Sequence, residues 1–199
     1  MPLEPWAQAH GLAGEHHYLG GVKAVGEQFH YALSDAQGGK WLTVLIFAAS
    51  ALHLRERDRR IGWEDEQRRR RLALVTNNVR FLLLPARSVP DLGTAILRKV
   101  PDRLSEDWQT RYAHPIIVVE TFVDPERFQG TVYKAASWVE LGQIEGNSRK
   151  IARLLPSPRQ AQAFVRAGTD AEGPEPFAGH GAQALVGRGR GQGGGDQSA

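Results

Sequence analysis

The fold of this 199-residue chain is decided between Arg57 and Pro85, where two polar packets lie beside apolar runs. The packets read Arg57-Asp58-Arg59-Arg60-Ile61-Gly62-Trp63 and Asn77-Asn78-Val79-Arg80-Phe81-Leu82-Leu83-Leu84-Pro85. The apolar end of the second packet predicts a buried strand over residues 80–84, which stops at Pro85 because proline has no N–H to donate. Buried Arg, Asp and Asn side chains beside such a strand need hydrogen-bonding partners. The stretch therefore marks a polar site within an apolar core.

Strand-like and helix-like segments alternate outward from this stretch. Alternating polarity and β-branched or aromatic residues predict strands over residues 28–33, 41–48, 116–122, 138–141 and 161–166. Helix-forming residues and start signals predict helices over residues 64–74, 90–100, 104–112 and 130–136, with Pro101 ending the second of them. We therefore expect an α/β (or α+β) fold, a mixed central sheet with helices on both faces.

Length and composition limit the classes of protein to which this chain can belong. With 41% hydrophobic and 24% charged residues, the chain suits one globular domain of about 150 residues plus a tail. We expect a loose leader over residues 1–14, a domain over 15–167 and a disordered Gly- and Arg-rich tail over 168–199, where apolar surface is scarce. The absence of cysteine excludes disulfides, thiol catalysis and Cys-based zinc sites. Without a signal peptide or a bilayer-length apolar segment, a cytoplasmic protein with no membrane partner is expected.

Arg57, Asp58 and Trp63 form the first candidate site. In one interpretation, the Arg–Asp pair orients a polar ligand beside Trp63 as a stacking wall, and Asp58 takes part in catalysis. In the other, the pair is a structural ion pair that closes a turn at Gly62, and Trp63 belongs to the core. Both interpretations fit the residue pattern.

Asn77, Asn78 and Arg80 form the second candidate site. Amides placed before a buried strand can hydrogen-bond a substrate or the edge of a nucleic-acid base. They can equally satisfy the backbone of a turn. His17, adjacent to His16, is a further candidate for ligand contact. Because the pair lacks a second histidine at i, i+4 spacing and the chain lacks cysteine, no metal site is predicted.

Glu120 lies inside an otherwise apolar strand segment. Partial desolvation there would raise the pKa of its carboxyl group toward the range of a general base. The alternative is a salt bridge to Arg80 or Arg57 across neighbouring strands.

The densest positive charge is the run Arg68, Arg69, Arg70 and Arg71 at the end of the predicted helix 64–74. Acidic residues nearby offset much of this charge, so the segment is either a solvated helix with ion pairs or a surface for the phosphates of DNA or RNA. A net charge of +3 and a pI near 9.4 permit nucleic-acid binding without requiring it.

Several motifs occur in a fixed order along residues 11–146. They include His16-His17-Tyr18-Leu19-Gly20, Ile61-Gly62-Trp63, the whole second packet, Val89-Pro90-Asp91-Leu92, Glu120-Thr121-Phe122-Val123-Asp124-Pro125 and Tyr133-Lys134-Ala135-Ala136-Ser137-Trp138. This series resembles the DruA family, named for a protein of the Druantia anti-phage system. Similar domains occur alone, next to transposases or fused with them. The resemblance therefore implies a mobile-element or defence setting, with a transposase or other defence-system proteins as partners.

The layout also resembles, more remotely, the GCN5-related acyltransferase fold, with residues 80–85 and 116–122 as its two central strands. This resemblance would make Tyr133 a general acid, although a packed helix tyrosine is the alternative. Acyltransferases cradle a pyrophosphate with glycine N–H groups at a helix start. Pro90 and Leu92 stand at the glycine positions and Asp91 adds negative charge, which argues against ordinary acetyl-CoA binding. The sequence specifies no cofactor.

Three functions remain open. The first is a nucleic-acid-associated accessory protein of a mobile element or of phage defence. The second is a divergent acyl- or aminoacyl-type transferase with Glu120 as base and Tyr133 as acid. The third is an inactive, truncated copy, because residues 146–149 resemble a degraded form of the glycine- and arginine-rich turn expected there.

Overall fold

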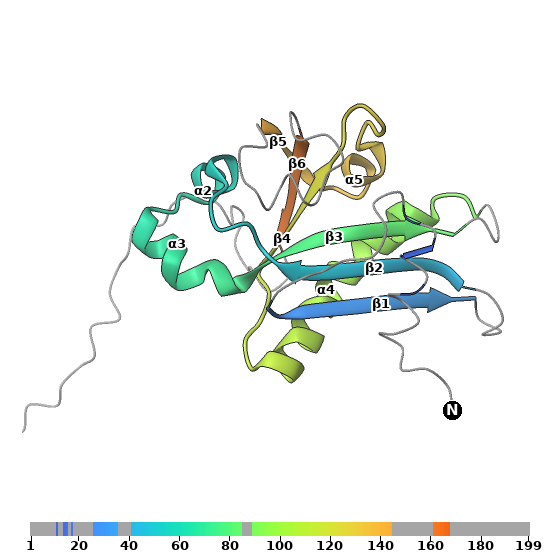
Figure 1. Cartoon of the computed structure of the whole chain (residues 1–199), viewed down its shortest axis with the longest axis horizontal. Helices are drawn as coiled ribbons and strands as arrows, with labels where there is room; N and C mark the ends of the chain where they lie inside the picture. The colour runs from blue at the N-terminus through green and yellow to red at the C-terminus, as the bar shows by residue number, and fades with distance from the viewer. Residues whose placement is uncertain are drawn as a thin grey trace, which may run out of the picture.

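The computed structural model describes Gly11, Gly14, Glu15, His17 and residues 26–35, 41–84, 89–144 and 161–167. In this part of the chain six strands form one sheet, in the order β1-β2-β3-β4-β6-β5 (Figure 1). The strands are β1 (Gln28–Ser34), β2 (Trp41–Ala49), β3 (Val75–Leu83), β4 (Val118–Val123), β5 (Val139–Ile144) and β6 (Ala161–Ala167). The helices are α2 (Arg55–Ile61), α3 (Asp65–Arg71), the 3-10 turn η1 (Leu72–Leu74), α4 (Leu92–Tyr112) and α5 (Thr131–Ala135). The predicted mixed α/β class is confirmed.

The parallel pair of β3 and β4 joins two antiparallel halves of the sheet. β1, β2 and β3 form one half, and β4, β6 and β5 form the other. β3 and β4 pair only from Val75 opposite Val118 to Asn78 opposite Thr121. Beyond that point the two strands diverge, as Figure 1 shows. The central strands β3 and β4 are therefore paired at one end and separated at the other.

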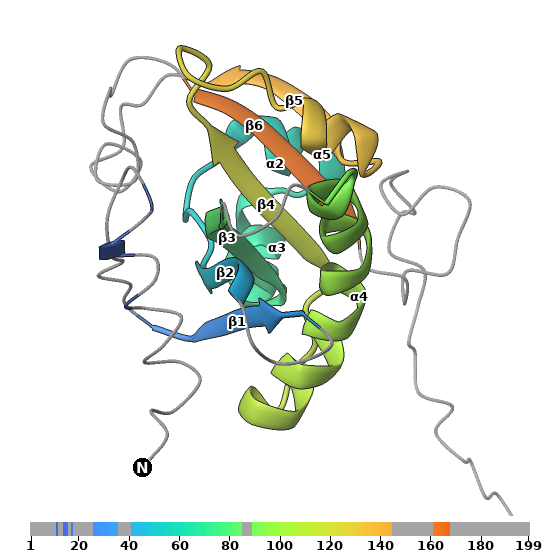
Figure 2. The same cartoon turned by 90° about the vertical axis from the view of Figure 1, so that its right-hand side faces the viewer.

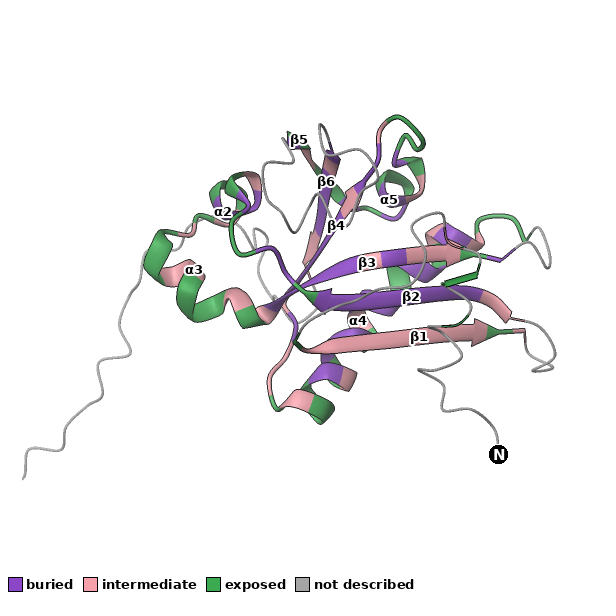
Figure 3. Ribbon diagram, in the orientation of Figure 1, coloured by how far each residue is buried: buried purple, intermediate pink, exposed green. Residues whose placement is uncertain are grey.

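Helices cover both faces of the sheet. Figure 2 shows α4 running along one face, where it buries a cluster that includes Phe47, Leu97, Leu104, Trp108 and Phe164. The segment that ends α2 covers part of the other face. There Ile61 and Trp63 pack against buried valines of β3, β4 and β6, so Trp63 belongs to a core cluster. Burial is strongest in the central strands, whereas the edge strand β1 is only half-buried (Figure 3).

β3 begins at Val75, five residues before the predicted start, and the placement of Asn77 and Asn78 before the strand was wrong. Both residues lie inside β3 and are 2% and 3% exposed. Asparagine is unfavourable in strands by local propensity. Here the strand is paired with β2 on one side and β4 on the other, and this long-range pairing overrides the local preference.

The prediction that Pro101 ends a helix was also wrong, because the 21-residue helix α4 continues through Pro101 to Tyr112. Proline has no N–H, so the carbonyl of Leu97 loses its usual partner one turn later. Trp138 Nε1 and Arg166 Nη1 donate to that oxygen instead, at 3.2 and 3.0 Å. Donors from outside the helix thus replace the missing bond. The two helices predicted over residues 90–100 and 104–112 are therefore one helix, and Ser105 lies within it.

Replacing Arg166 with leucine should lower the free energy of unfolding by about 1 to 2 kcal/mol, because a buried carbonyl loses one of its donors. The same change should cost less in a Pro101→Ala background, where residue 101 regains an N–H that can reach Leu97. Urea unfolding of the wild type, the two single variants and the double variant measures the coupling between residues 101 and 166. Equal losses in the two backgrounds would show that Arg166 does not replace the missing helix bond.

The expected leader, the expected tail and the degraded run over 146–149 lie almost entirely outside the described residues. The predicted domain boundaries therefore stay predictions. Within the described part of the chain, no helix combines the length and hydrophobicity needed to cross a lipid bilayer.

Candidate functional site

Arg57 lies at the centre of a buried charge cluster where the start of α2 meets the sheet. Its side chain is fully buried. Nε and Nη2 donate to Asp58 Oδ1 at 2.9 and 2.7 Å, and Nη1 donates to Glu120 Oε2 at 3.0 Å. Nη1 also donates to Ser50 Oγ and to the carbonyl of Ala51, at 2.7 and 2.8 Å. The two sequence-predicted carboxylates are thus both bound to one guanidinium.

Glu120 is fully buried, and both of its carboxylate oxygens are hydrogen-bonded. Oε2 accepts from Arg57, while Oε1 accepts from Ser50 Oγ and the backbone N–H of Ala51, each at 2.9 Å. Burial raises the pKa of Glu120, and Arg57, Ala51 and Ser50 oppose that rise. Of the two salt bridges considered from the sequence, the structure contains the one to Arg57. The role of Glu120 as a general base stays a prediction.

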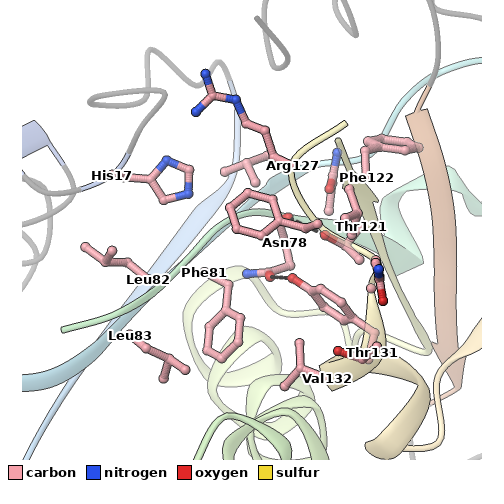
Figure 4. Close-up of a pocket in the computed structure, with 17 residues that line it drawn as sticks. His17, Asn78, Phe81, Leu82, Leu83, Thr121, Phe122, Arg127, Thr131 and Val132 are labelled. Carbon is pink, nitrogen blue, oxygen red and sulfur yellow. Dashed lines mark hydrogen bonds between the residues drawn. The ribbon is translucent and has the colours of Figure 1, made fainter. Parts of the chain in front are cut away.

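A pocket of about 730 Å³ lies where β3 and β4 diverge (Figure 4). Its volume falls within the range of about 300 to 1,000 Å³ that is typical of small-molecule sites. Four residues predicted as site residues line it, namely His17, Asn77, Asn78 and Tyr133. The Arg57 cluster is not part of its lining. The structure therefore separates Arg57, Asp58 and Glu120 from the four predicted residues that line the pocket.

Side chains satisfy the backbone of β3 where its pairing with β4 ends. Thr121 Oγ1 donates to the carbonyl of Asn78 at 3.0 Å, and Arg80 Nη1 donates to the carbonyl of Val79 at 2.6 Å. Asn78 Nδ2 donates to the carbonyl of Arg80 at 2.9 Å and to that of Ile46 at 3.3 Å. Val79 is the extra residue of a bulge against β2. Asn78 and Arg80 therefore hold the open end of β3 in place.

Tyr133, on α5, lies on the side of the pocket nearest the core. Its ring is stacked on Phe164 with centroids 5.5 Å apart, and it meets Trp138 edge-on at 5.2 Å. Its hydroxyl lies 3.4 Å from Asn78 Oδ1, the bond drawn in Figure 4. Tyr133 is thus both a packed helix tyrosine and part of the pocket lining.

The opposite side of the pocket carries His17 and Arg127, as Figure 4 shows. Burial, with the nearby charge of Arg80, lowers the pKa of His17 to about 4, so its imidazole is neutral at pH 7. The side chain of Arg127 is 54% exposed, and its nearest described carboxylate oxygen, on Asp124, is 3.8 Å away. Phe128 is 50% exposed beside it.

Arg127 and Phe128 were not among the site residues predicted from the sequence. A cation and an aromatic residue side by side in a turn were the available signal, since neither is needed to make one. Asn77 carries a different signal. It is almost fully buried, and its Oδ1 accepts no hydrogen bond within the described residues.

The four consecutive arginines, Arg68 to Arg71, differ in exposure and in ion pairing. Arg68 is 11% exposed and contacts Asp58 and Asp65 at 3.3 and 2.9 Å. Arg70 pairs with the exposed Glu66. Arg69 and Arg71 are exposed. Figure 1 shows α3 on the left of the molecule, away from α5, and no residue of α3 lines the pocket.

Two acetyltransferases are among the solved structures that resemble this chain. The ribosomal-protein-S5-alanine acetyltransferase from Vibrio fischeri is 10% identical with a TM-score of 0.43, and the match covers 72% of this chain and 63% of that one. The spermidine N-acetyltransferase SpeG from Vibrio cholerae is 11% identical with a TM-score of 0.40, covering 70% and 65%. This chain thus spans less than two thirds of either protein, and the likeness carries no information on activity.

No curated protein matches the sequence. A family model described as Druantia protein DruA matches residues 10–152, which include the Arg57 cluster, α3 and all the described residues that line the pocket. Since this match covers well over half of the chain, the protein belongs to the DruA family of the Druantia anti-phage defence system.

Proposed function

We propose that this chain is a nucleic-acid-associated accessory protein of phage defence or of a mobile element. DNA or RNA is its ligand, and a transposase or another defence-system protein is its partner. One observation carries the proposal. The α2–α3 surface presents four exposed arginines that have no ion-pair partner among the described residues, Arg55, Arg59, Arg69 and Arg71.

The buried charge cluster supports this proposal because it ties α3 to α2. Asp58 accepts from Arg57 through Oδ1 and from Arg68 through Oδ2. A capping box at Glu64 and Gln67 fixes the start of α3. The exposed arginines therefore lie on a positioned surface. Arginines that contact phosphates displace condensed counterions, so their contribution to affinity falls as salt rises.

Replacing Arg69 and Arg71 with glutamine should weaken binding of the full chain to duplex and single-stranded DNA. The slope of log Kobs against log salt should become shallower by about 1 for each arginine that contacts a phosphate. Fluorescence anisotropy over a salt series measures both quantities. Lys99→Gln, an exposed cation on α4, is the matched control and should change neither. Absence of salt-dependent binding to DNA and RNA would refute the proposal.

A divergent acyl-type transferase is the second candidate, with Glu120 as base and Tyr133 as acid. The Tyr133 hydroxyl at the pocket favours it. Glu120 gives it less support, because it is bound to Arg57 and does not line the pocket. Calorimetric titration of the full chain with acyl-CoA tests this candidate, and the absence of binding would remove it.

A further inference from the structure

We propose that the pocket between β3 and β4 binds an extended, apolar peptide segment of a partner protein, which adds a short strand to the open edge of β3 (Figure 4). The site gives the protein partner of the function proposed above a place to bind, and in that respect it rests on that function. It lies away from the α2–α3 surface, no residue of which lines the pocket, and it needs no nucleic acid.

The pairing of β3 with β2 shows which main-chain groups of β3 face the pocket. The N–H of Leu84 donates to the carbonyl of Leu42 at 2.9 Å. Hydrogen-bonded and non-hydrogen-bonded pairs alternate along an antiparallel ladder, so Leu82 also turns its N–H and C=O groups toward β2. Phe81 and Leu83, which alternate with Leu82 and Leu84, therefore turn theirs to the opposite side, where β4 has diverged from β3.

These outward groups have no strand beside them. β3 is paired with β4 only as far as Asn78, whose carbonyl accepts from Thr121 Oγ1 at 3.0 Å. Within the described residues, no hydrogen bond joins the N–H or C=O groups of Phe81 or Leu83 to another strand on this side. An unpaired strand edge is a template for pairing with another chain. The two residues are about 6.6 Å apart along β3, which is the repeat at which an extended peptide presents its own groups.

The side chains beside this edge suit apolar peptide side chains on both faces of an added strand. Phe81 and Leu83 point toward Gly93 at the start of α4, where a Cβ would lie 3.5 and 3.1 Å from their side chains. Val79 and Leu82 pack against the buried residues of β2 on the other face. All four side chains line the pocket. Since the side chains of a strand alternate between its two faces, an inserted strand would meet apolar surface on both, and the 45%-exposed Leu83 would become covered.

The start of α4 favours a neutral main chain over a ligand that carries a pyrophosphate, such as acyl-CoA. Pro90 has no N–H, and the N–H of Leu92 donates to the carbonyl of Val89 at 3.3 Å. Two positions at the helix start therefore offer no N–H to a phosphate. Asp91, between them, is exposed and adds negative charge. A peptide needs none of these donors, because it pairs with the edge of β3 itself.

Amide hydrogen exchange of the unliganded full chain tests the open edge. The N–H groups of Phe81 and Leu83 should exchange at least about ten-fold faster than the N–H of Leu82, which faces β2. Similar protection of all three groups would show that the edge is already paired, and would overturn the proposal.

The peptide probes are N-acetylated, C-amidated heptapeptides of the pattern Lys-Val-Xaa-Val-Xaa-Val-Lys, in which Xaa is valine, isoleucine, leucine or phenylalanine. Isothermal titration calorimetry with the full chain should show saturable, one-to-one binding of at least one probe. That probe should also slow hydrogen exchange at Phe81 and Leu83. The matched control is the same peptide with N-methyl groups on alternate amides, made in two forms that block either edge of the peptide. One of the two forms should lose binding, because its side chains are kept but its donors on that edge are removed.

Leu83→Pro tests the edge from the side of the protein. It removes an N–H that faces the pocket and leaves the hydrogen bonds between β2 and β3 in place. Peptide binding should weaken about ten-fold through the loss of this donor. Leu83→Ala keeps the N–H and shortens the side chain, so it should weaken binding less. Thermal unfolding checks that both variants keep the fold, and the N-methylated peptides test the same contacts without altering the protein.

The proposal is overturned if no probe binds saturably, if both N-methylated forms bind as tightly as the parent peptide, or if acyl-CoA alone protects Phe81 and Leu83 from exchange. The Arg69→Gln/Arg71→Gln protein separates this site from the nucleic-acid surface. It should lose salt-dependent DNA affinity and keep peptide binding, whereas Leu83→Pro should do the reverse. Either claim can therefore fail without the other.

Discussion

Replacement of Arg57 by methionine should lower the free energy of unfolding at neutral pH by about 3 to 5 kcal/mol. The substitution removes the only guanidinium that contacts Glu120 among the described residues and the closer of two that contact Asp58. Glu120 is fully buried and cannot regain water, so its charge is left uncompensated. Methionine keeps much of the apolar stem, which limits the loss of packing. Urea denaturation measures the change.

The pH dependence of this loss separates charge from packing. Burial raises the pKa of Glu120, and Arg57 is the largest opposing influence. A carboxyl group whose folded pKa is raised contributes most stability below its unfolded pKa, and that contribution is lost as pH rises through the folded pKa. The deficit of Arg57→Met should therefore shrink as pH falls toward 4.5, the ordinary pKa of the group. A deficit that does not change with pH would point to packing alone.

The matched control is Arg70→Met, which removes an arginine from an exposed pair with Glu66. Exposed ion pairs contribute little because water already solvates both charges. The control should therefore unfold close to wild type. If Arg57→Met were equally mild, the buried cluster would not be what holds α2 against the sheet.

Replacement of Gly130 by alanine should be the second severe change, at about 2 to 5 kcal/mol. Gly130 precedes α5 with φ +67, a conformation that disfavours a side chain. A Cβ there would also lie 2.7 Å from Cε2 of Phe164, and closer still to its Cζ. Phe164 is fully buried and stacked on Tyr133, so its ring has no free space to enter. Thermal or urea unfolding measures the loss.

Gly62→Ala provides the control for backbone strain. Gly62 has φ +79, but a Cβ there would meet nothing within 4 Å. This change should cost only the conformational penalty of about 1 to 2 kcal/mol. The difference between the two variants then isolates the clash with Phe164. Equal losses at Gly62 and Gly130 would contradict the packing described for α5.

Local sequence signals were enough to predict the apolar strands and the short helix before Trp138. Such segments carry their own pattern of burial, as β2 and β4 do. The extent of β3 and the continuity of α4 could not be predicted this way. Both depend on partners distant in sequence, the flanking strands for Asn77 and the Trp138 and Arg166 donors for the turn before Pro101.

The same distinction applies to the candidate site. The contact of Glu120 with Arg57 was one of two salt bridges that the charge pattern allowed. The pocket exists because β3 and β4 diverge after Asn78 and Thr121. No local sequence pattern predicts that divergence. Arg127 and Phe128 line this pocket only because the two strands separate.

Amide chemical-shift mapping of the full chain, titrated with a short single-stranded DNA, tests the central claim most directly. The claim is that nucleic acid binds this protein on the α2–α3 surface, whereas the buried Arg57 cluster holds α2 and α3 in place. The predicted result is perturbation at Arg69 and Arg71, which weakens as salt rises. No perturbation, or perturbation confined to residues away from this surface, would contradict it.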